Sequence, residues 1–502
     1  MICSLTSVLL HGTSIDEISI QVDVSKRGFP YCRIVGLPHR SVAESRDRIK
    51  SAILNSGLTF PRSRTTINLS PADMPKQGAQ LDIAIATALM CAQGYVPANR
   101  LQGVLLIGEL SLDGCLLPVR GLRAMIQYAQ KTGYETVYYP SFQVKECADI
   151  EGITCFPVPK FIDLINHLRG ISALEIPRTN IKEKPSDNSP EIDFKNILGQ
   201  KKAKRALLIA AAGRHHVIMK GPPGIGKTLL AQAMHSIIPH PDNDEHNRIR
   251  SIQSIVGSDA WHASERPFIN PLPTTTLRDF LGEKDGNSIS DVTKAFGGVL
   301  FMDELPEFRK ESISTLKKIL ETEQTRDRNF QLIAAQNPCP CGNYGHPKKK
   351  CICQMKSISR YREKISDAIL DRIDIHITLQ DVEYSHSAHE EVGSSVLQSQ
   401  SEKAKKFATV RLSELGISAN AHISLDMVEK VCKIDPQSQA FIDAMMIKHG
   451  LSIRAYHSIL KVSRTIADLY TSKTILLKHV EEAVRLRGLE EKNEYVASHI
   501  AF

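Results

Sequence analysis

The stretch GPPGIGKT at residues 221–228 constrains the fold more than any other part of the chain. It follows a short apolar run at residues 217–219 and precedes a helical pattern at 229–236. Its three glycines let the backbone turn tightly, so that several N–H groups point at one centre. A turn of this kind between a strand and a helix binds phosphate, and the helix N-terminus adds to the attraction for anions. The stretch therefore predicts a parallel α/β domain with a nucleotide site, and a chance glycine turn is the alternative.

The side chains of this loop have separate expected roles. Lys227 places a positive charge near the β- and γ-phosphates, and the hydroxyl of Thr228 reaches Mg²⁺. The expected ATP-binding residues are Gly221, Pro222, Pro223, Gly224, Ile225, Gly226, Lys227, Thr228 and Leu229.

Two further apolar runs end in polar side chains and complete the expected nucleotide site. The run at 299–302 is followed by Asp303 and Glu304, and the run at 331–335 is followed by Asn337. We expect Asp303 to hold Mg²⁺ and Glu304 to act as the base that orients the attacking water. Asn337 could contact the γ-phosphate or the water. The alternatives are an ordinary strand end for the two acids and a capping role for Asn337.

At 502 residues the chain is too long for one core, and its net charge of +8 permits an acidic partner such as nucleic acid. No apolar run reaches the length of a membrane span, so we expect a cytoplasmic protein. Residues 172–192 are polar and without period, which predicts a linker between a domain at 1–171 and a nucleotide-binding domain at 193–383. The remainder, 384–502, has a helical pattern.

Four of the eleven cysteines, Cys339, Cys341, Cys351 and Cys353, fall within 15 residues. Four thiolates can close a tetrahedral structural zinc site, and His346 could replace one of them. Reduced free thiols and a redox switch are the alternatives. Lys348, Lys349 and Lys350 lie between the two pairs, where they form either a solvated charge run or a contact for DNA phosphates.

Several longer words in the sequence resemble one family. They are ILGQ, GPPGIGKT, GVLFMDELPEF, AAQNPCPCG, YREKISDAILDRIDIHI and RAYHSILKVSRTIADL. Their order resembles the AAA+ ATPases of the magnesium-chelatase-like branch. Together with the N-terminal part, nearly the whole chain resembles the ComM (YifB-like) competence proteins. The resemblance implies an AAA+ P-loop core followed by a C-terminal helical lid.

The resemblance also assigns roles to two arginines. Arg372 corresponds to the arginine finger, which reaches the nucleotide site of a neighbouring subunit, and Arg454 corresponds to the second sensor arginine, which binds ATP. Guanidinium groups stabilise charge on a transferring phosphoryl group. Two alternatives stay open. Arg372 could pair with Asp371 or Asp374 at the surface, and Arg454 could belong to a solvated polar face of its helix, together with Lys461 and Asp468.

Residues 59–139 resemble the proteolytic domain of Lon proteases, an α+β, ribosomal-protein-like fold. Lon-like peptidases use a serine and a lysine of lowered pKa. The serine's region here reads QGAQ at 77–80, and the lysine's region ends in Arg123, which cannot act as a base. We therefore expect a catalytically inactive domain with a role in scaffolding or oligomerisation.

The resemblance implies a hexameric, Mg²⁺- and ATP-dependent motor on single-stranded and branched DNA. Its expected activity is branch migration of recombination intermediates during natural transformation. Two departures bear on DNA engagement: Pro271–Leu272–Pro273 stands where relatives carry a histidine pair, and the stretch before residue 331 is too short for the family's β-hairpin. The alternatives are a metal-chelatase ATPase subunit, an ATP-dependent protease or unfoldase, and a nucleotide-switched scaffold without helicase activity.

Overall fold

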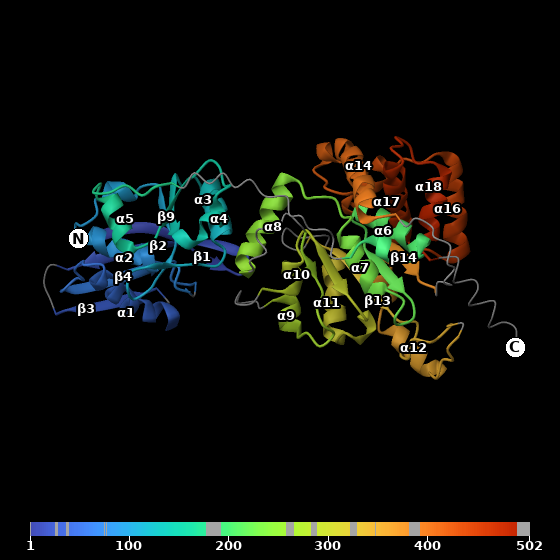
Figure 1. The fold of residues 1–502 in the computed structure, drawn as a ribbon, viewed down its shortest axis with the longest axis horizontal. Coiled ribbons are helices and arrows are strands. Elements are labelled where there is room, and N and C mark those ends of the chain that lie inside the picture. Colours follow the sequence, from blue (N-terminus) through green and yellow to red (C-terminus); the bar gives the residue numbers. More distant parts are fainter. Residues whose placement is uncertain are drawn as a thin grey trace. The chain divides into compact units, whose positions relative to one another are not determined.

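A computed structural model describes the greater part of the chain (Figure 1). The described residues are 2–25, 29–36, 40–74, 76, 78–176, 192–257, 266–282, 289–321, 329–346, 348–380 and 392–488. Most of the expected linker and the shortened stretch before residue 331 lie outside them. No helix in these ranges is long and apolar enough to cross a membrane.

The chain divides into two compact units. The first comprises Met1–Ser186, Asn247–Ala263 and Glu283–Ile289, and the second comprises Asp187–His246, Ser264–Gly282 and Ser290–Phe502. The grouping differs from the expected domains in two respects: parts of the range 193–383 belong to the first unit, and the ranges on both sides of residue 384 belong to one unit.

The first unit is α+β. Its four-stranded sheet has the order β1-β2-β4-β3, with β3 and β4 parallel and the other pairs antiparallel. A three-stranded parallel sheet has the order β5-β8-β9, and β6 pairs with β7. The strands are β1 Ile2–His11, β2 Ser14–Val24, β3 Tyr31–Val35, β4 Arg64–Ser70, β5 Val104–Leu106, β6 Glu109–Leu110, β7 Leu116–Leu117, β8 Thr136–Pro140 and β9 Thr154–Val158. The helices are α1 Arg40–Asn55, α2 Asp82–Ala92, α3 Leu122–Thr132, α4 Val144–Cys147 and α5 Phe161–Leu168.

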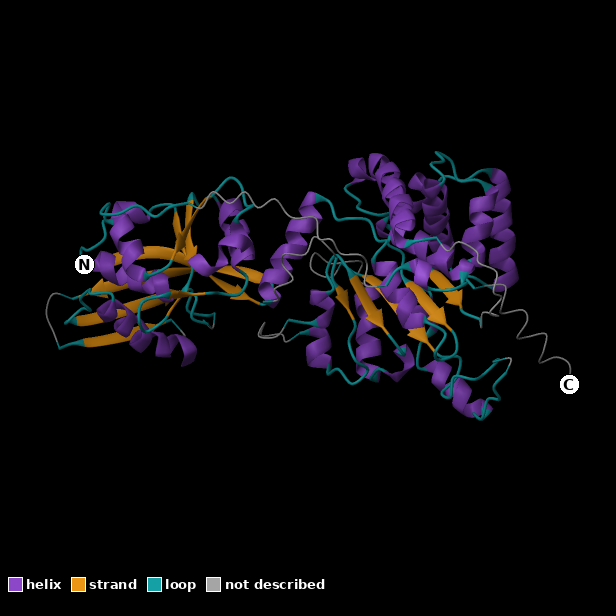
Figure 2. Cartoon of the chain, viewed as in Figure 1, coloured by secondary structure: helices purple, strands orange, loops and turns teal. Residues whose placement is uncertain are grey.

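The second unit is built on a five-stranded parallel sheet of order β11-β12-β13-β10-β14 (Figure 2). The strands are β10 Val217–Lys220, β11 Phe268–Ile269, β12 Val299–Met302, β13 Gln331–Gln336 and β14 Ile375–Thr378. The helices of this part are α6 Lys201–Gly213, α7 Lys227–His235, α9 Leu277–Leu281, α10 Asp291–Lys294, α11 Lys310–Glu321, α12 Met355–Glu363 and α13 Asp367–Leu370. Helix α8 Asn243–Val256 begins in the second unit, and its residues from Asn247 onward belong to the first. The three strands and the phosphate-loop helix expected from the sequence are all confirmed.

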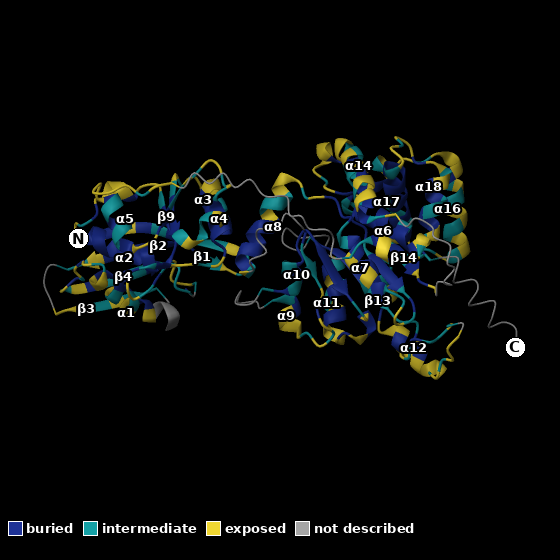
Figure 3. Cartoon of the chain, viewed as in Figure 1, coloured by how far each residue is buried: buried dark blue, intermediate teal, exposed yellow. Residues whose placement is uncertain are grey.

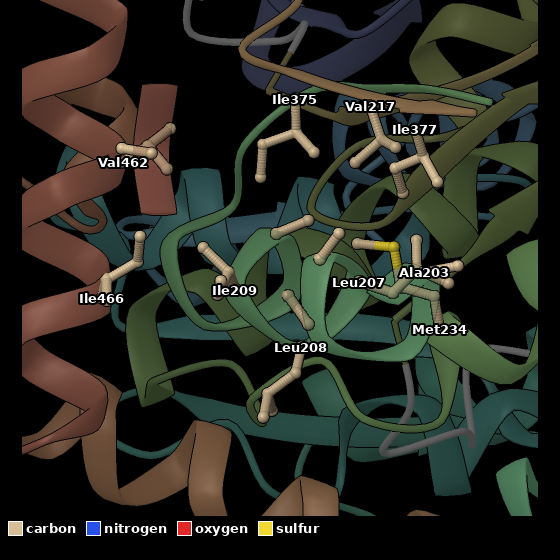
Figure 4. Packing of buried hydrophobic residues seen from close by; sticks show 14 of the residues in the cluster. Ala203, Leu207, Leu208, Ile209, Val217, Met234, Ile375, Ile377, Val462 and Ile466 are labelled. Carbon is tan, nitrogen blue, oxygen red and sulfur yellow. The ribbon is translucent and has the colours of Figure 1, made fainter. Parts of the chain in front are cut away.

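Helices cover both faces of this sheet, and its strands are therefore continuous apolar runs (Figure 3). Val217 and Met219 belong to one apolar cluster, while Ile218 between them belongs to the cluster on the other face. Figure 4 shows α6 between the strands and α17, with Ile209 turned toward Val462 and Ile466.

The C-terminal part is helical, as expected. Its helices are α14 Ser394–Leu412, α15 Leu425–Val431, α16 Pro436–His449, α17 Ile453–Leu469 and α18 Leu477–Arg485. Buried polar contacts tie α17 to the sheet. His215, which precedes β10, lies 2.8 Å from the hydroxyl of Thr465 and 2.9 Å from the carboxylate of Asp374.

Candidate nucleotide site

The phosphate loop lies at the carboxyl end of β10. Gly224 and Gly226 have φ angles of +81° and +92°, a conformation that glycine adopts without strain. Helix α7 begins at Lys227, so that Thr228 lies in its first turn. The backbone N–H groups of this turn have no intrahelical acceptors and can bind an anion.

Lys227 is buried at the centre of the loop and makes three hydrogen bonds. Its Nζ donates to the carbonyls of Gly221 and Pro222 at 2.8 and 2.9 Å, and to Oδ1 of Asn337 at 2.9 Å. Burial lowers the pKa of Lys227, and the carboxylates of Asp303 and Glu304 oppose this shift. The side chain of Asn337 thus contacts the Lys227 ammonium, which is the group that would bind a phosphate.

Thr228 and Asp303 bring two oxygen atoms together at the same edge of the sheet. The hydroxyl of Thr228 donates to the Asp303 carboxylate at 2.8 Å. Hydroxyl and carboxylate oxygens are ligands that Mg²⁺ prefers. With the anion-binding turn beside them, the residues present fit a magnesium nucleotide. When bound, Mg²⁺ would neutralise charge on the phosphates.

Glu304 is exposed beside this oxygen pair and has an unusual backbone. Its φ and ψ are +53° and +46°, and its N–H donates to Asp303 at 3.0 Å. A non-glycine residue in the left-handed region is uncommon and often marks a functional position. The turn directs the carboxylate away from the apolar strand that precedes it, where it is available to water.

Arg372 and Arg454 lie at the opposite edge of the sheet. Both line an open pocket of about 400 Å³, together with His216 and Phe330, the residues that precede β10 and β13. The parallel strand β10 has four residues, which corresponds to roughly 13 Å between its ends. Neither arginine therefore lies beside the phosphate loop of its own chain.

The partners of Arg372 differ from those considered in the sequence. Its guanidinium donates to Glu321 at 2.9 Å, and also to the carbonyl of Ala368. Burial lowers its pKa, and the nearby Arg454 lowers it further. Asp374 is engaged by His215 and Ser458 instead. Glu321, at the end of α11, was not predicted as the partner of Arg372, because the two residues are 51 positions apart in the sequence.

The helix that carries Arg454 does not have the polar face expected as an alternative. Asp468 is buried and accepts hydrogen bonds from Arg411 and Arg464. Ile453, the first residue of the helix, is 72% exposed. Residues spaced by seven shift around an α-helix of 3.6 residues per turn. Members of such a series can therefore be exposed at the start of the helix and buried at its end.

The four cysteines meet in one cluster. The sulfur atoms of Cys339, Cys341, Cys351 and Cys353 all lie within 4.8 Å of one another. Backbone N–H groups of Asn343 and Ile352 lower the pKa of Cys341 to about 6, whereas burial and the neighbouring thiols raise the pKa of Cys351 and Cys353, so that one thiolate is favoured in the cluster without a metal. His346 is not among the residues whose ligand atoms meet in this cluster, and its Nδ1 accepts from the N–H of Lys348 at 3.0 Å. The donor set fits a tetrahedral, soft metal ion.

In the first unit, Arg123, the last residue of the stretch compared with the Lon lysine's region, is buried in an ion-pair network. Its guanidinium donates to both carboxylate oxygens of Asp149, at 2.6 and 2.8 Å. Asp149 also accepts from Arg250 at 2.7 Å, and Arg123 donates to Asn247 at 2.9 Å. A guanidinium keeps all its protons at neutral pH and cannot act as a general base, so these ion pairs give Arg123 a structural role.

Family models match three parts of the chain. Residues 193–387 match the model described as "Magnesium chelatase, subunit ChlI". Residues 20–142 match "Subunit ChlI of Mg-chelatase", and residues 391–487 match "Magnesium chelatase, subunit ChlI C-terminal".

Individual relatives match over nearly the whole length. "Uncharacterized protein YifB" of Escherichia coli is 33% identical over 499 residues, which covers 95% of this chain and 96% of YifB. "Competence protein ComM" of Haemophilus influenzae is 32% identical over 494 residues, with the same coverage of both chains. A Lon protease of Brevibacillus choshinensis is 30% identical over 106 residues, 20% of this chain and 13% of the protease. The chain therefore belongs to the YifB and ComM family of magnesium-chelatase-like AAA+ ATPases.

Proposed function

We propose that the protein is a Mg²⁺- and ATP-dependent motor that acts on single-stranded and branched DNA as a hexameric ring. Its activity would be branch migration of recombination intermediates during integration of DNA in natural transformation. The ATPase activity is supported by two hydrogen bonds at the carboxyl edge of the sheet, from Lys227 to Asn337 and from Thr228 to Asp303. The DNA part is supported by similarity to a relative named a competence protein.

The residue roles follow from this proposal. Thr228 and Asp303 hold the magnesium ion, and Glu304 orients the attacking water. Asn337 holds the Lys227 ammonium in place by a hydrogen bond. Through this bond, the presence of a γ-phosphate would affect the position of the segment that follows β13. The phosphate loop itself, from Gly221 to Leu229, holds the phosphate chain through its backbone N–H groups.

Arg372 and Arg454 complete the site from a neighbouring subunit. Each lies at the edge of the sheet opposite to its own phosphate loop, and both line one pocket. This placement favours a shared role across a subunit interface, with Arg454 acting beside the finger rather than on the nucleotide of its own chain. An oligomer is what the AAA+ family implies, and a closed ring provides every site with such a partner.

The cysteine cluster is proposed to hold one structural Zn²⁺. With four protein ligands no position is left open for catalysis. The measurement is the metal content of the purified protein, where one zinc per chain is expected. Cys351→Ser should lose most of it, while Cys115→Ser, a cysteine remote in sequence, should retain it. Full zinc content in Cys351→Ser would contradict the assignment.

A second candidate is an ATPase subunit of a metal-insertion enzyme, which the three chelatase models favour. The Lon-like similarity of the first unit is the feature that such a subunit does not need. For that unit we propose an inactive, scaffolding role, because Arg123 is committed to Asp149.

ATP hydrolysis with and without single-stranded and branched DNA tests the proposal. We expect stimulation by DNA in the wild type, and a loss of at least about 100-fold in kcat for Glu304→Gln. Strand displacement on a branched substrate is then the direct assay of the motor. Hydrolysis that is indifferent to DNA would overturn the motor and leave the metal-insertion subunit or a nucleotide-switched scaffold.

A further inference from the structure

The cysteine cluster organises a projecting segment, residues 338–364, which we call the knuckle. Its first residues leave the nucleotide site and its last residues form helix α12. Between Tyr344 and Lys364 it carries seven lysines and arginines and one acidic residue. Such a charge excess on one short segment is the electrostatic footprint of a phosphate-binding surface.

The basic side chains at the tip of the knuckle are available to a ligand. Lys348, Lys349 and Lys350 are exposed, and within the described residues they form no ion pair. Ile352, between the last two cysteines, is 86% exposed, and Met355 is 56% exposed. These apolar side chains are close in sequence to the lysines, so that a single strand bound through its phosphates could place unpaired bases against them.

The base of the knuckle is packed against the phosphate loop. A Cβ atom added to Gly342 would lie 2.3 Å from Cδ of Pro223, so that Gly342 lies directly against the ring of Pro223. Gly342 donates to the carbonyl of Cys339 at 2.9 Å, and the N–H of Tyr344 donates to the sulfur of Cys339 at 3.3 Å. A displacement of the cysteines would therefore reach Pro223 directly.

A second connection runs through Asn337, two residues before Cys339. Its side chain accepts from Lys227 at 2.9 Å, while Arg362 of α12 donates to the carbonyl of Pro338 at 3.3 Å. Arg362 also lies over the ring of Tyr344, 5.0 Å from its centroid. The knuckle is thus joined to the nucleotide site at Lys227 as well as at Pro223.

We propose that the knuckle is the DNA sensor of this ATPase: its lysine tip binds the phosphates of single-stranded DNA, and its base transmits that contact to the phosphate loop. The inference rests on the proposed function and assigns the residues by which DNA would stimulate hydrolysis. A chain of packed and hydrogen-bonded groups, such as the one that joins the knuckle to the phosphate loop, can carry energetic coupling between two sites, and a comparison of binding with hydrolysis on the same variants measures it.

The first test compares the full-length wild type with a Lys348→Ala, Lys349→Ala, Lys350→Ala variant. The control replaces three exposed lysines of the C-terminal helices, Lys403, Lys406 and Lys430, by alanine. Binding of a fluorescent oligo-dT of ~30 nucleotides should weaken at least about tenfold in the tip variant only. The slope of log K against log salt concentration should become shallower by about 2, since each phosphate contact on a single strand contributes about 0.7.

Hydrolysis measured on the same proteins separates this inference from the proposed function. The tip variant should keep its basal rate and lose stimulation by oligo-dT, whereas the control should keep both. Stimulation of the tip variant equal to that of the wild type would overturn the inference and leave the proposed function intact. A wild type without stimulation would overturn the proposed function and the coupling together, and the binding comparison would still decide whether the tip contacts DNA.

A second variant tests the path from the knuckle to the loop. Gly342→Ala forces a methyl group against Pro223 in a backbone conformation with φ of +77°. It should bind oligo-dT within about twofold of the wild type but lose most of the stimulation, with knuckle folding checked by retention of metal. Gly342→Ala with normal affinity and normal stimulation would exclude the contact with Pro223 as the route.

Discussion

At the scale of single residues, the backbone of Glu304 combines a functional position with local strain. Its φ of +53° and ψ of +46° lie in the left-handed region. Alanine in this conformation costs about 1 kcal/mol more than glycine. Glu304→Gly should therefore be more stable than Glu304→Ala by that amount, although neither hydrolyses ATP. Thermal unfolding should give a midpoint roughly 2–4 °C higher for the glycine variant.

A helical position provides the matched control for this comparison. Ser314 is exposed within α11, where glycine is about 1 kcal/mol less stable than alanine. The order of stability between glycine and alanine should be reversed there. An equal or lower midpoint for Glu304→Gly than for Glu304→Ala would show that residue 304 is not held in this conformation in solution.

Asn337 tests whether the hydrogen bond to Lys227 acts in turnover or only in binding. Asn337→Ala removes the acceptor at 2.9 Å from the ammonium but leaves the carbonyls of Gly221 and Pro222. We expect kcat to fall about 10- to 100-fold with less than a fivefold change in nucleotide affinity, because the loop still holds the phosphates. Steady-state hydrolysis and binding of a fluorescent ATP analogue measure the two effects. A change confined to affinity would assign Asn337 a binding role.

At the scale of elements, one carboxylate between two arginines fixes the first turn of α8 within the second unit. Glu245 accepts from Arg214, and from Arg266 at 2.8 Å through both oxygens. All three side chains are largely buried. Glu245→Gln leaves two buried guanidinium groups without a counter-charge and should cost about 3 kcal/mol. The thermal midpoint should fall by roughly 6–12 °C. As a control, Glu311→Gln, at an exposed position of α11, should change the midpoint by less than about 2 °C.

The same carboxylate predicts a pH dependence. Burial alone would raise the pKa of Glu245, but Arg214 and Arg266 outweigh it and hold the pKa well below its usual range. A group with a lowered folded pKa stabilises the protein fully above its unfolded pKa of about 4.3, and this contribution is lost as the pH falls through the folded pKa. The difference in midpoint between wild type and Glu245→Gln should be constant near neutral pH and shrink below about pH 4. A difference independent of pH would contradict the ion pairs.

The elements that the sequence predicted well are those with a local signal. Runs of apolar residues identified β10, β12 and β13, because strands of a parallel sheet are buried on both faces. The ion pair of Arg266 with Glu245 and that of Arg372 with Glu321 were not identified, since each joins elements that only the folded chain brings together. The burial of Asp468 was not predicted for the same reason, because its ion-pair partner Arg411 lies on another helix.

At the scale of the whole molecule, the residues expected to act on the nucleotide lie at two edges of the sheet. Lys227 and Glu304 lie at its carboxyl edge and Arg372 at its amino edge, which agrees with the expectation that Arg372 reaches the site of a neighbouring subunit. A length of roughly 13 Å of strand lies between the edges. Motif order alone does not distinguish a residue that acts on its own nucleotide from one that acts on a neighbour's; the family resemblance supplied that distinction for Arg372 but not for Arg454.

Mixing of inactive subunits tests whether Arg372 acts between chains. Lys227→Ala disables the phosphate loop and Arg372→Ala disables the finger, so that each homogeneous assembly should lose at least about 100-fold in hydrolysis. Mixed assemblies contain interfaces that join an intact loop to an intact finger, and hydrolysis should return to a measurable fraction of the wild-type rate. No recovery under conditions where size measurements show co-assembly would place Arg372 outside the site or within its own chain.

The same experiment decides the side from which Arg454 acts. If Arg454 and Arg372 both serve a neighbour's nucleotide, as their common pocket indicates, each subunit of an Arg372→Ala and Arg454→Ala mixture presents a defective interface, and activity should not recover. If Arg454 instead serves its own nucleotide, a subunit with Arg372→Ala keeps an intact site and a subunit with Arg454→Ala supplies an intact finger. Recovery in that mixture would therefore return Arg454 to the phosphate loop of its own chain, and would require a movement of α17 that brings it there.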